Sequence, residues 1–147
     1  MDPADFYQHI QAVRAQVQND RALLRAIHFF EEDARVPLQV QALKDQDLSR
    51  FFELVIESGH SSFMYLQNVT SPSDIRHQSL ALALALSEKV LKGRGAWRVH
   101  GGGLAGTIQA FVPLDLLDVY QQVMDDCFGA GSCHVLSIRP EGGVRLL

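Results

Sequence analysis

The first two thirds of the chain carry hydrophobic residues at helical spacing. Asp2 and Pro3 suit the cap and first turn of a helix that ends near residues 19–20, and its apolar face consists of Phe6, Ile10, Val13 and Val17. A longer helix is expected from residue 21 to about residue 43, with a kink or break at Pro37, because proline removes a backbone donor. Its apolar stripe comprises Leu23, Leu24, Ile27, Phe30, Ala34, Leu38 and Leu43.

Two further helices follow from capping residues and composition. Asp45 and Asp47 suit the N-cap of a helix whose inward residues are Leu48, Phe51, Phe52, Val55 and Ile56. The sequence Ser-Pro-Ser-Asp at 71–74 predicts the start of the next helix. Residues 80–86 alternate Leu and Ala with the period of a strand, yet both residue types are strong helix formers. We therefore expect a buried helix that ends near residues 92–93.

The last third of the chain has a mixed pattern. Residues 97–99 and 107–112 are expected to form antiparallel strands joined by a glycine-rich turn, followed by an amphipathic helix over 113–128. Residues 133–138 and 144–147 flank Pro-Glu-Gly-Gly and predict a second hairpin. Together the elements predict an α+β fold in one domain spanning residues 1–147, with helices packed on one face of a small antiparallel sheet.

Composition narrows the classes of function. The chain has 147 residues, 47% of them hydrophobic, which suffices for one core. A net charge of −4 without a basic tract argues against partners such as nucleic acid or anionic membranes. No apolar run approaches the ~18–20 residues of a membrane span. Without a signal peptide in the sequence, we expect a cytoplasmic protein.

The cysteines and histidines suggest neither a disulfide nor a metal site. Cys127 and Cys133 are close enough in sequence for a small-loop disulfide, but reduced thiols are the favoured interpretation. The six histidines lack the spacing that brings ligands together on one ion, so no metal site is expected.

The glycine-rich turn is the first candidate site. Consecutive glycines are typical of positions where φ is positive or where a Cβ would collide with a ligand or a neighbouring strand. A tight hairpin turn and a loop that approaches a ligand are both consistent with this pattern. The candidate residues are His100, Gly101, Gly102, Gly103, Leu104, Ala105 and Gly106.

A second candidate lies at Ser58, His60 and Ser61. These residues could form a pocket of hydroxyls around a histidine, but small residues in one helical turn more often allow close packing on a neighbouring element. His60 by itself favours a structural role, because no carboxylate or nucleophile is placed beside it by sequence.

Three stretches of the chain resemble signatures of the GHMP small-molecule kinases, and of a divergent bacterial-type branch of galactokinases in particular. Residues 95–106, Gly-Ala-Trp-Arg-Val-His-Gly-Gly-Gly-Leu-Ala-Gly, are similar to the family pattern G-A-R-M-T-G-G-G-F-G-G. Arg25-Ala26-Ile27-His28, with Glu32 and Arg35-Val36, resembles R-A-x-H-x-x-x-E-x-x-R-V. Residues 57–62, with 71–74 downstream, resemble E-S-H-x-S…S-x-P-E-L-D, although Gly59 is inserted.

The resemblance covers roughly residues 22–112 and implies the C-terminal domain of such a kinase, a ferredoxin-like variant of the α+β class. By analogy the glycine-rich turn would help to shape the phosphate and sugar site, with His100 or Arg98 as an additional donor. A solvated charge at the edge of the strand is an equal alternative for Arg98. Leu104 and Ala105 replace Phe and Gly of the family pattern, and Val99-His100 replaces Met-Thr.

The family's phosphate loop and catalytic Asp have no counterpart in these 147 residues. The resemblance therefore implies no catalytic residue in this chain, with ATP and Mg²⁺ bound only by the complete enzyme. The expected partner is the N-terminal kinase domain, and self-association through the exposed domain-junction face is a further expectation. The alternative is a freestanding small-molecule-binding or interaction module that kept the fold without the chemistry.

Overall fold

The chain begins with two short helices that pack on a long third helix. The computed structural model describes residues 2–104 and 106–138. Helices α1 (Pro3–Gln8) and α2 (Ile10–Val17) replace the single helix expected from the sequence. The break falls at His9, whose ring Nδ1 lies 2.9 Å from the Asp5 carbonyl oxygen and competes with regular helical bonding. Phe6 anchors α1 by packing edge-on against Phe30 of the third helix, with ring centroids 5.3 Å apart.

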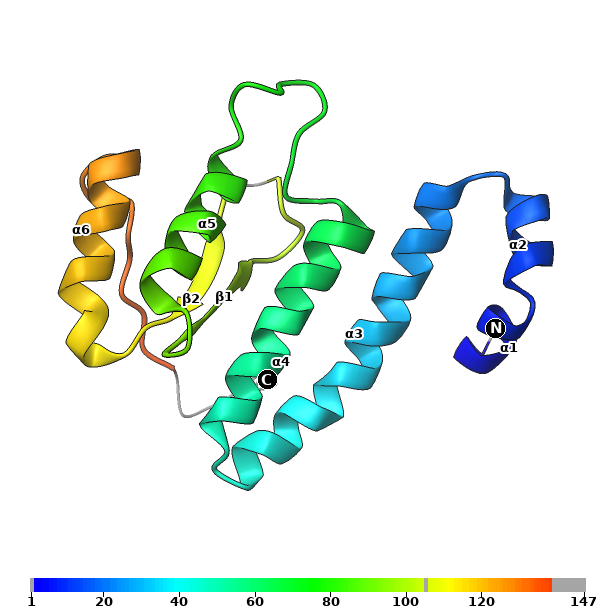
Figure 1. The fold of residues 1–147 in the computed structure, drawn as a ribbon, viewed down its shortest axis with the longest axis horizontal. Coiled ribbons are helices and arrows are strands. Elements are labelled where there is room, and N and C mark those ends of the chain that lie inside the picture. The colour runs from blue at the N-terminus through cyan, green and yellow to red at the C-terminus, as the bar shows by residue number, and fades with distance from the viewer. Residues whose placement is uncertain (1, 105, 139–147) are drawn as a thin grey trace, which may run out of the picture.

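Helices α3 (Asp20–Lys44) and α4 (Leu48–Ser61) form a hairpin and lie side by side (Figure 1). Each is capped by a side chain that accepts a backbone N–H, Asn19 for α3 and Asp47 for α4, as expected for Asp47. Helix α3 continues through Pro37 without a break. Helix α3 packs along α4. Helix α4 runs on into a π-helical turn, η1 (Ser62–Leu66).

The expected helix start at 71–74 is wrong. Helix α5 (Ser79–Leu91) begins several residues later, and residues 67–78 form a loop. The Asp74 carboxylate accepts the backbone N–H groups of Arg76 and His77, and the Gln78 side chain bonds both backbone groups of Ser71. These local bonds satisfy the backbone without a helix. The Leu/Ala segment is helical as predicted, with Leu80 and Leu91 buried and Leu82 half exposed.

Strands β1 (Ala96–Val99) and β2 (Ile108–Phe111) pair antiparallel, with Trp97 opposite Ala110 and Val99 opposite Ile108. Trp97 packs in a core with Leu91, Tyr120 and Met124. Gly59 of α4 lies instead against Arg98, the residue between Trp97 and Val99. Because neighbouring side chains in a strand point to opposite sides, helices reach β1 from both sides of the strand rather than from one. The predicted α+β class is confirmed.

Helix α6 (Leu117–Phe128) follows a short 3-10 turn, η2 (Leu114–Leu116), and packs on α5. Tyr120 joins the two helices through a buried hydrogen bond with Ser87, with the hydroxyl oxygens 2.8 Å apart. Burial raises the pKa of the Tyr120 hydroxyl.

The strand expected at 133–138 is not formed. After α6, the Asp125 carboxylate accepts hydrogen bonds from the backbone N–H groups of Gly131 and Cys133 and from the Ser132 hydroxyl. The bond from Gly131 is the main cause that lowers the pKa of Asp125. These bonds wrap the chain around the end of α6. The second strand of the expected hairpin, residues 144–147, lies outside the described residues.

Candidate functional site

The glycine-rich segment forms the turn that joins β1 to β2, as the hairpin interpretation predicted. The His100 N–H donates to the Thr107 carbonyl oxygen over 3.1 Å and closes the base of the turn. The backbone adopts positive φ at Gly101, Gly103 and Gly106, and also at Leu104. His100 and most of the turn are exposed, and Ala105 lies outside the described residues. The described residues of this segment, 100–104 and 106–107, are hereafter called the glycine loop.

Gly103 is the buried point of the glycine loop. A Cβ at Gly103 would overlap the Asn68 carbonyl oxygen and lie 2.7 Å from the Asn68 side-chain Cγ and Nδ2. The same Asn68 carbonyl oxygen accepts the Leu104 N–H over 3.0 Å. Nothing comparable surrounds Gly101, Gly102 or Gly106, where an added Cβ would meet no atom within 4 Å. Of the three consecutive glycines, only Gly103 therefore makes the close approach that the sequence led us to expect. It approaches Asn68, in the segment that follows η1.

The second candidate site does not assemble around His60. Ser58 and Ser61 are buried, whereas the His60 side chain is exposed. A Cβ at Gly59 would lie 3.2 Å from Arg98 Cβ, so the small residues of α4 allow close packing on β1. This is the structural alternative that the sequence already favoured.

The two serines instead belong to a polar cluster between α3, α4 and β1. The Ser58 hydroxyl donates to Glu32 Oε2 over 2.7 Å, and Ser61 Oγ lies 3.4 Å from Glu31 Oε2. Arg98 of β1 approaches the same Glu32 oxygen as Ser58, with its Nη1 3.9 Å away. Glu32 therefore contacts both α4 and β1 from its position on α3.

Arg35 supplies much of the positive charge in this cluster. It forms an ion pair with Glu32 and lies 3.7 Å from Glu31 and 3.6 Å from Glu57, while its own side chain is only 10% exposed. Three carboxylates thus surround one nearly buried guanidinium. Removing the guanidinium would leave Glu31 without a cation among the described residues. Glu57 would keep Arg50 at 3.2 Å, and Glu32 would keep Arg98. The loss of a partner from a partly buried carboxylate costs more than the net contribution of the ion pair.

His28 completes the cluster on the η1 side of α3. Its ring Nδ1 lies 3.0 Å from Ser61 Oγ, and burial is the main cause that lowers the pKa of the imidazole. Glu32 and Glu31 oppose this shift, whereas Arg35 and Arg98 add to it. Ser61, His28 and Glu31 do not form a catalytic triad. The Glu31 carboxylate contacts Ser61 rather than His28, and Ser61 is buried.

The cluster unites the three stretches that carry the family resemblance. Glu32 comes from the first stretch, Ser58 from the second, and Arg98 from the third, two residues before the glycine loop. Arg98 Nε also donates to the Val99 carbonyl oxygen over 3.2 Å. The Arg98 side chain is thus engaged inward in this structure and not with the space above the loop.

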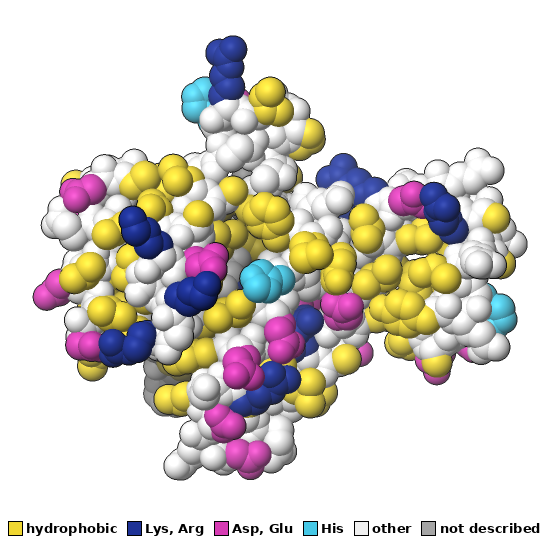
Figure 2. Space-filling model, viewed as in Figure 1, with side chains coloured by type: hydrophobic (Ala, Val, Ile, Leu, Met, Phe, Trp, Pro, Cys, Tyr) yellow, Lys and Arg dark blue, Asp and Glu magenta, His cyan; other side chains and the backbone are white. Residues whose placement is uncertain are grey.

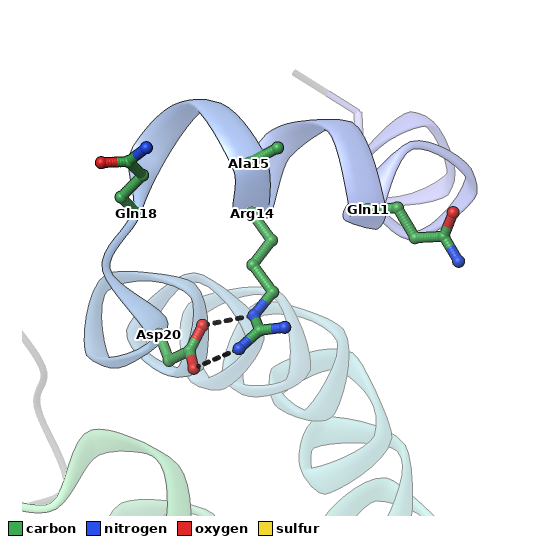
Figure 3. A pocket seen from close by; sticks show the side chains of 5 residues that line it. All are labelled: Gln11, Arg14, Ala15, Gln18 and Asp20. Atoms are coloured by element: carbon green, nitrogen blue, oxygen red, sulfur yellow. Dashed lines mark hydrogen bonds and ion pairs between the residues drawn. The ribbon is translucent and has the colours of Figure 1, made fainter.

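The surface hollows lie away from these residues. A hollow of about 450 Å³ at the corner of α2 and α3 is lined by Gln11, Arg14, Ala15, Gln18 and Asp20. Its charges neutralise each other, because Arg14 binds Asp20 through two nitrogens at 2.7 and 3.0 Å (Figure 3). A second hollow of about 320 Å³ lies at the start of α5 and contains His77, which pairs with Asp74 over 2.7 Å. Neither hollow contains a residue that the sequence selected.

Within residues 2–104 and 106–138, no group of three or more His, Cys, Asp or Glu is placed to hold a metal ion. No helix in the same ranges has the length and apolar character needed to cross a bilayer. Cys127 and Cys133 are free thiols, and burial raises the pKa of Cys133.

Comparison with known proteins gives a distant relationship. The chain is 28% identical over 116 residues to a galactokinase of Actinobacillus pleuropneumoniae, and the match covers 79% of this chain and 28% of that protein. The chain therefore spans little more than a quarter of the length of this curated relative. No protein-family model matches the chain. No solved structure matches it.

Sequence reasoning found the glycine loop but missed its underlying neighbour, Asn68. No periodicity or motif marks Asn68, because its role depends on a contact between segments far apart in the chain. The spacing of the α3 residues was a usable signal, since positions i, i+3, i+4 and i+7 share one helical face. These residues are His28, Glu31, Glu32 and Arg35.

Gly103→Ala should destabilise the protein by roughly 3 kcal/mol or more, because a Cβ would overlap backbone and force a strained positive φ. Gly102→Ala is the matched control and should change stability by less than about 1 kcal/mol. Urea unfolding of both variants measures the difference. Equal tolerance of the two substitutions would refute the contact between Gly103 and Asn68.

The lowered pKa of His28 predicts a pH-dependent stability. The unfolded chain takes up a proton near pH 6.5 and the folded chain only at lower pH, so stability should fall as the pH drops from about 7 towards 5. His28→Asn keeps a polar atom near the Nδ1 position and should flatten this slope, whereas His60→Asn, at an exposed position, should not. Chemical unfolding at several pH values measures the slope, and a slope unchanged in His28→Asn would contradict the assignment.

Proposed function

We propose that this chain is the C-terminal part of a galactokinase-like sugar kinase. The complete enzyme would phosphorylate galactose or a related sugar with ATP and Mg²⁺, and would work in the cytoplasm. The observation that carries the proposal is the junction at Glu32, where residues from all three galactokinase-like stretches meet. The distant similarity to galactokinase supports the same origin.

The proposed contribution of the chain is to position the glycine loop. Phosphoryl transfer is catalysed mainly by positioning and by stabilising charge, and glycine-rich turns expose backbone N–H groups to anionic ligands without an intervening side chain. In this chain the loop begins two residues after Arg98, which approaches Glu32. The cluster on α3 and α4 would thereby set the position of the loop relative to the rest of the enzyme.

The 147 residues alone are proposed to be inactive. They include no phosphate loop and no counterpart of the catalytic Asp, and the carboxylates near the glycine loop are already engaged with Arg35 and Ser58. ATP, Mg²⁺ and most of the sugar contacts would then be supplied by the N-terminal kinase domain.

Reconstitution tests this proposal. The purified chain should release no ADP from MgATP with galactose, but should restore galactose-dependent release when mixed with the Actinobacillus pleuropneumoniae galactokinase from which the matched 116 residues have been deleted. Gly102→Ala serves as a folded reference, and Gly103→Ala should restore less activity. A folded chain that neither binds nor activates the truncated enzyme would favour a freestanding module, and turnover by the chain alone would refute the inactivity.

Several exposed apolar side chains support the proposal that a partner domain covers part of this chain's surface. Leu104 in the glycine loop is 60% exposed, and one face of α3 carries Phe29, Val36, Val40 and Leu43, all largely exposed. Figure 2 shows hydrophobic side chains gathered between α3 and the first two helices, whereas charged side chains gather along the lower part of α4. An exposed apolar helix face such as that of α3 is typical of a surface that another polypeptide covers.

Self-association through these side chains is the corresponding prediction. The chain alone should form dimers or larger assemblies at high concentration, and light scattering across a dilution series measures them. Val36→Glu, on the exposed face of α3, should shift the equilibrium towards monomer, whereas Val17→Glu, an exposed position on α2, should shift it less. A parent chain that stays monomeric at all concentrations would refute the prediction.

A further inference from the structure

Asn68 is a buried polar residue without a hydrogen-bond partner for its side chain. The residue is 6% exposed, and both Oδ1 and Nδ2 are buried with no partner among the described residues. Its backbone carbonyl oxygen, by contrast, accepts the Leu104 N–H. The unpaired side-chain amide lies directly beneath Gly103, the buried point of the glycine loop.

A buried amide without partners lowers the stability of the conformation that buries it. Burying one polar group without a hydrogen bond costs on the order of 1–3 kcal/mol, because its bonds to water are lost and not replaced. The glycine loop is the cover that causes this burial. If the loop lifts, the amide regains water, and the cost disappears.

Two backbone hydrogen bonds of the described loop residues oppose such a movement. The Leu104 N–H to Asn68 carbonyl bond ties its tip to the underlying segment, and the His100 N–H to Thr107 carbonyl bond lies at its base. Glycines at positions 101, 103 and 106 occupy positive φ, so the backbone can change conformation there without a side-chain penalty. Leu104 holds a positive φ of 39° without that freedom, which adds strain to the observed form.

We propose that Asn68 is the positioning residue of the glycine loop and makes it a two-state flap. The structure shows the closed state, in which Gly103 rests on Asn68 and the amide is unpaired. In the open state the Leu104 N–H bond is broken and the Asn68 amide is exposed, able to donate and to accept hydrogen bonds. Asn68 thus keeps the closed state only marginally favourable. This property of the fold does not depend on the proposed kinase function.

Hydrogen exchange of the Leu104 amide measures the opening directly. Asn68→Leu keeps the branched shape of the side chain but removes both polar atoms, so the closed state no longer carries the cost of the unpaired amide. Exchange of the Leu104 N–H in the 147-residue chain should slow by roughly fivefold or more relative to the parent chain. Thr70→Val, a polar-to-apolar change at an exposed position two residues away, is the matched control and should leave this rate unchanged.

A second variant moves the loop in the opposite direction. Asn68→Asp places a carboxylate beneath Gly103, and burying that charge should favour the open state at pH 7. Exchange of the Leu104 N–H should then be faster than in the parent, after correction for the intrinsic rate. Amides of β1 and β2 away from the loop serve as an internal reference for global unfolding in every variant.

Two results would overturn the proposal. Faster Leu104 exchange in Asn68→Leu, with the sheet amides still protected, would mean that the Asn68 amide has partners in solution and stabilises the closed loop. Equal changes at Leu104 and at the sheet amides in both variants would mean that Asn68 acts on global stability only. Reconstitution with the truncated galactokinase has a separate readout, so a failure of the kinase proposal would not be mistaken for a failure of the flap.

Discussion

The carboxylate of Glu32 is the contact on which the arrangement of the other elements depends. It lies on α3, accepts a hydrogen bond from Ser58 of α4, and faces Arg98 of β1. Arg35 forms an ion pair with it and also lies near Glu31 and Glu57. Networks of partly buried charges contribute little net stability but penalise any arrangement that leaves one member unpaired. The charges thus add specificity to the apolar contacts between the helical hairpin and the sheet, where Phe51 and Phe52 of α4 pack on Phe111 of β2.

The position of the glycine loop follows from that junction. The loop begins two residues after Arg98, so its start is set by the strand that Glu32 and Gly59 hold against α4. Its tip is set by a different contact, the seat of Gly103 on Asn68 after the π-helical turn. The base and the tip of the loop therefore depend on contacts with separate parts of the chain. The conformation of the tip can change without altering the base.

Sequence reasoning predicted those elements whose determinants are local. Helix α4 is predicted by its N-cap Asp47 and by the spacing of its apolar residues. The two strands are predicted by the apolar residues on either side of the glycines. The helix start at 71–74 was wrong because Asp74 and Gln78 bond nearby backbone in a loop, a choice that capping statistics do not distinguish. The strand expected at 133–138 does not form, and the Asp125 carboxylate instead accepts the backbone N–H groups of Gly131 and Cys133.

In the candidate site, too, local features were predicted from the sequence, whereas features that depend on distant contacts were not. The need for glycine was visible in the sequence, but which glycine is essential was not, since Gly102 and Gly103 differ only in what lies beneath them. Ser58 and Ser61 were selected as a group with His60, yet a helix turns His60 away from them and towards solvent. Asn68 carries no pattern at all, because its role comes from a contact across more than thirty positions of chain.

Trp97 has a further consequence as the single tryptophan of the chain. It is nearly buried in the core formed with Leu91, Tyr120 and Met124, on the side of β1 opposite Arg98. Its fluorescence therefore reports on the sheet and on the packing of α5 and α6, and is insensitive to separation of the first two helices from α3. The chain carries a built-in optical probe for one half of its structure, and the half that contains the α1–α3 contact is spectroscopically silent at tryptophan wavelengths.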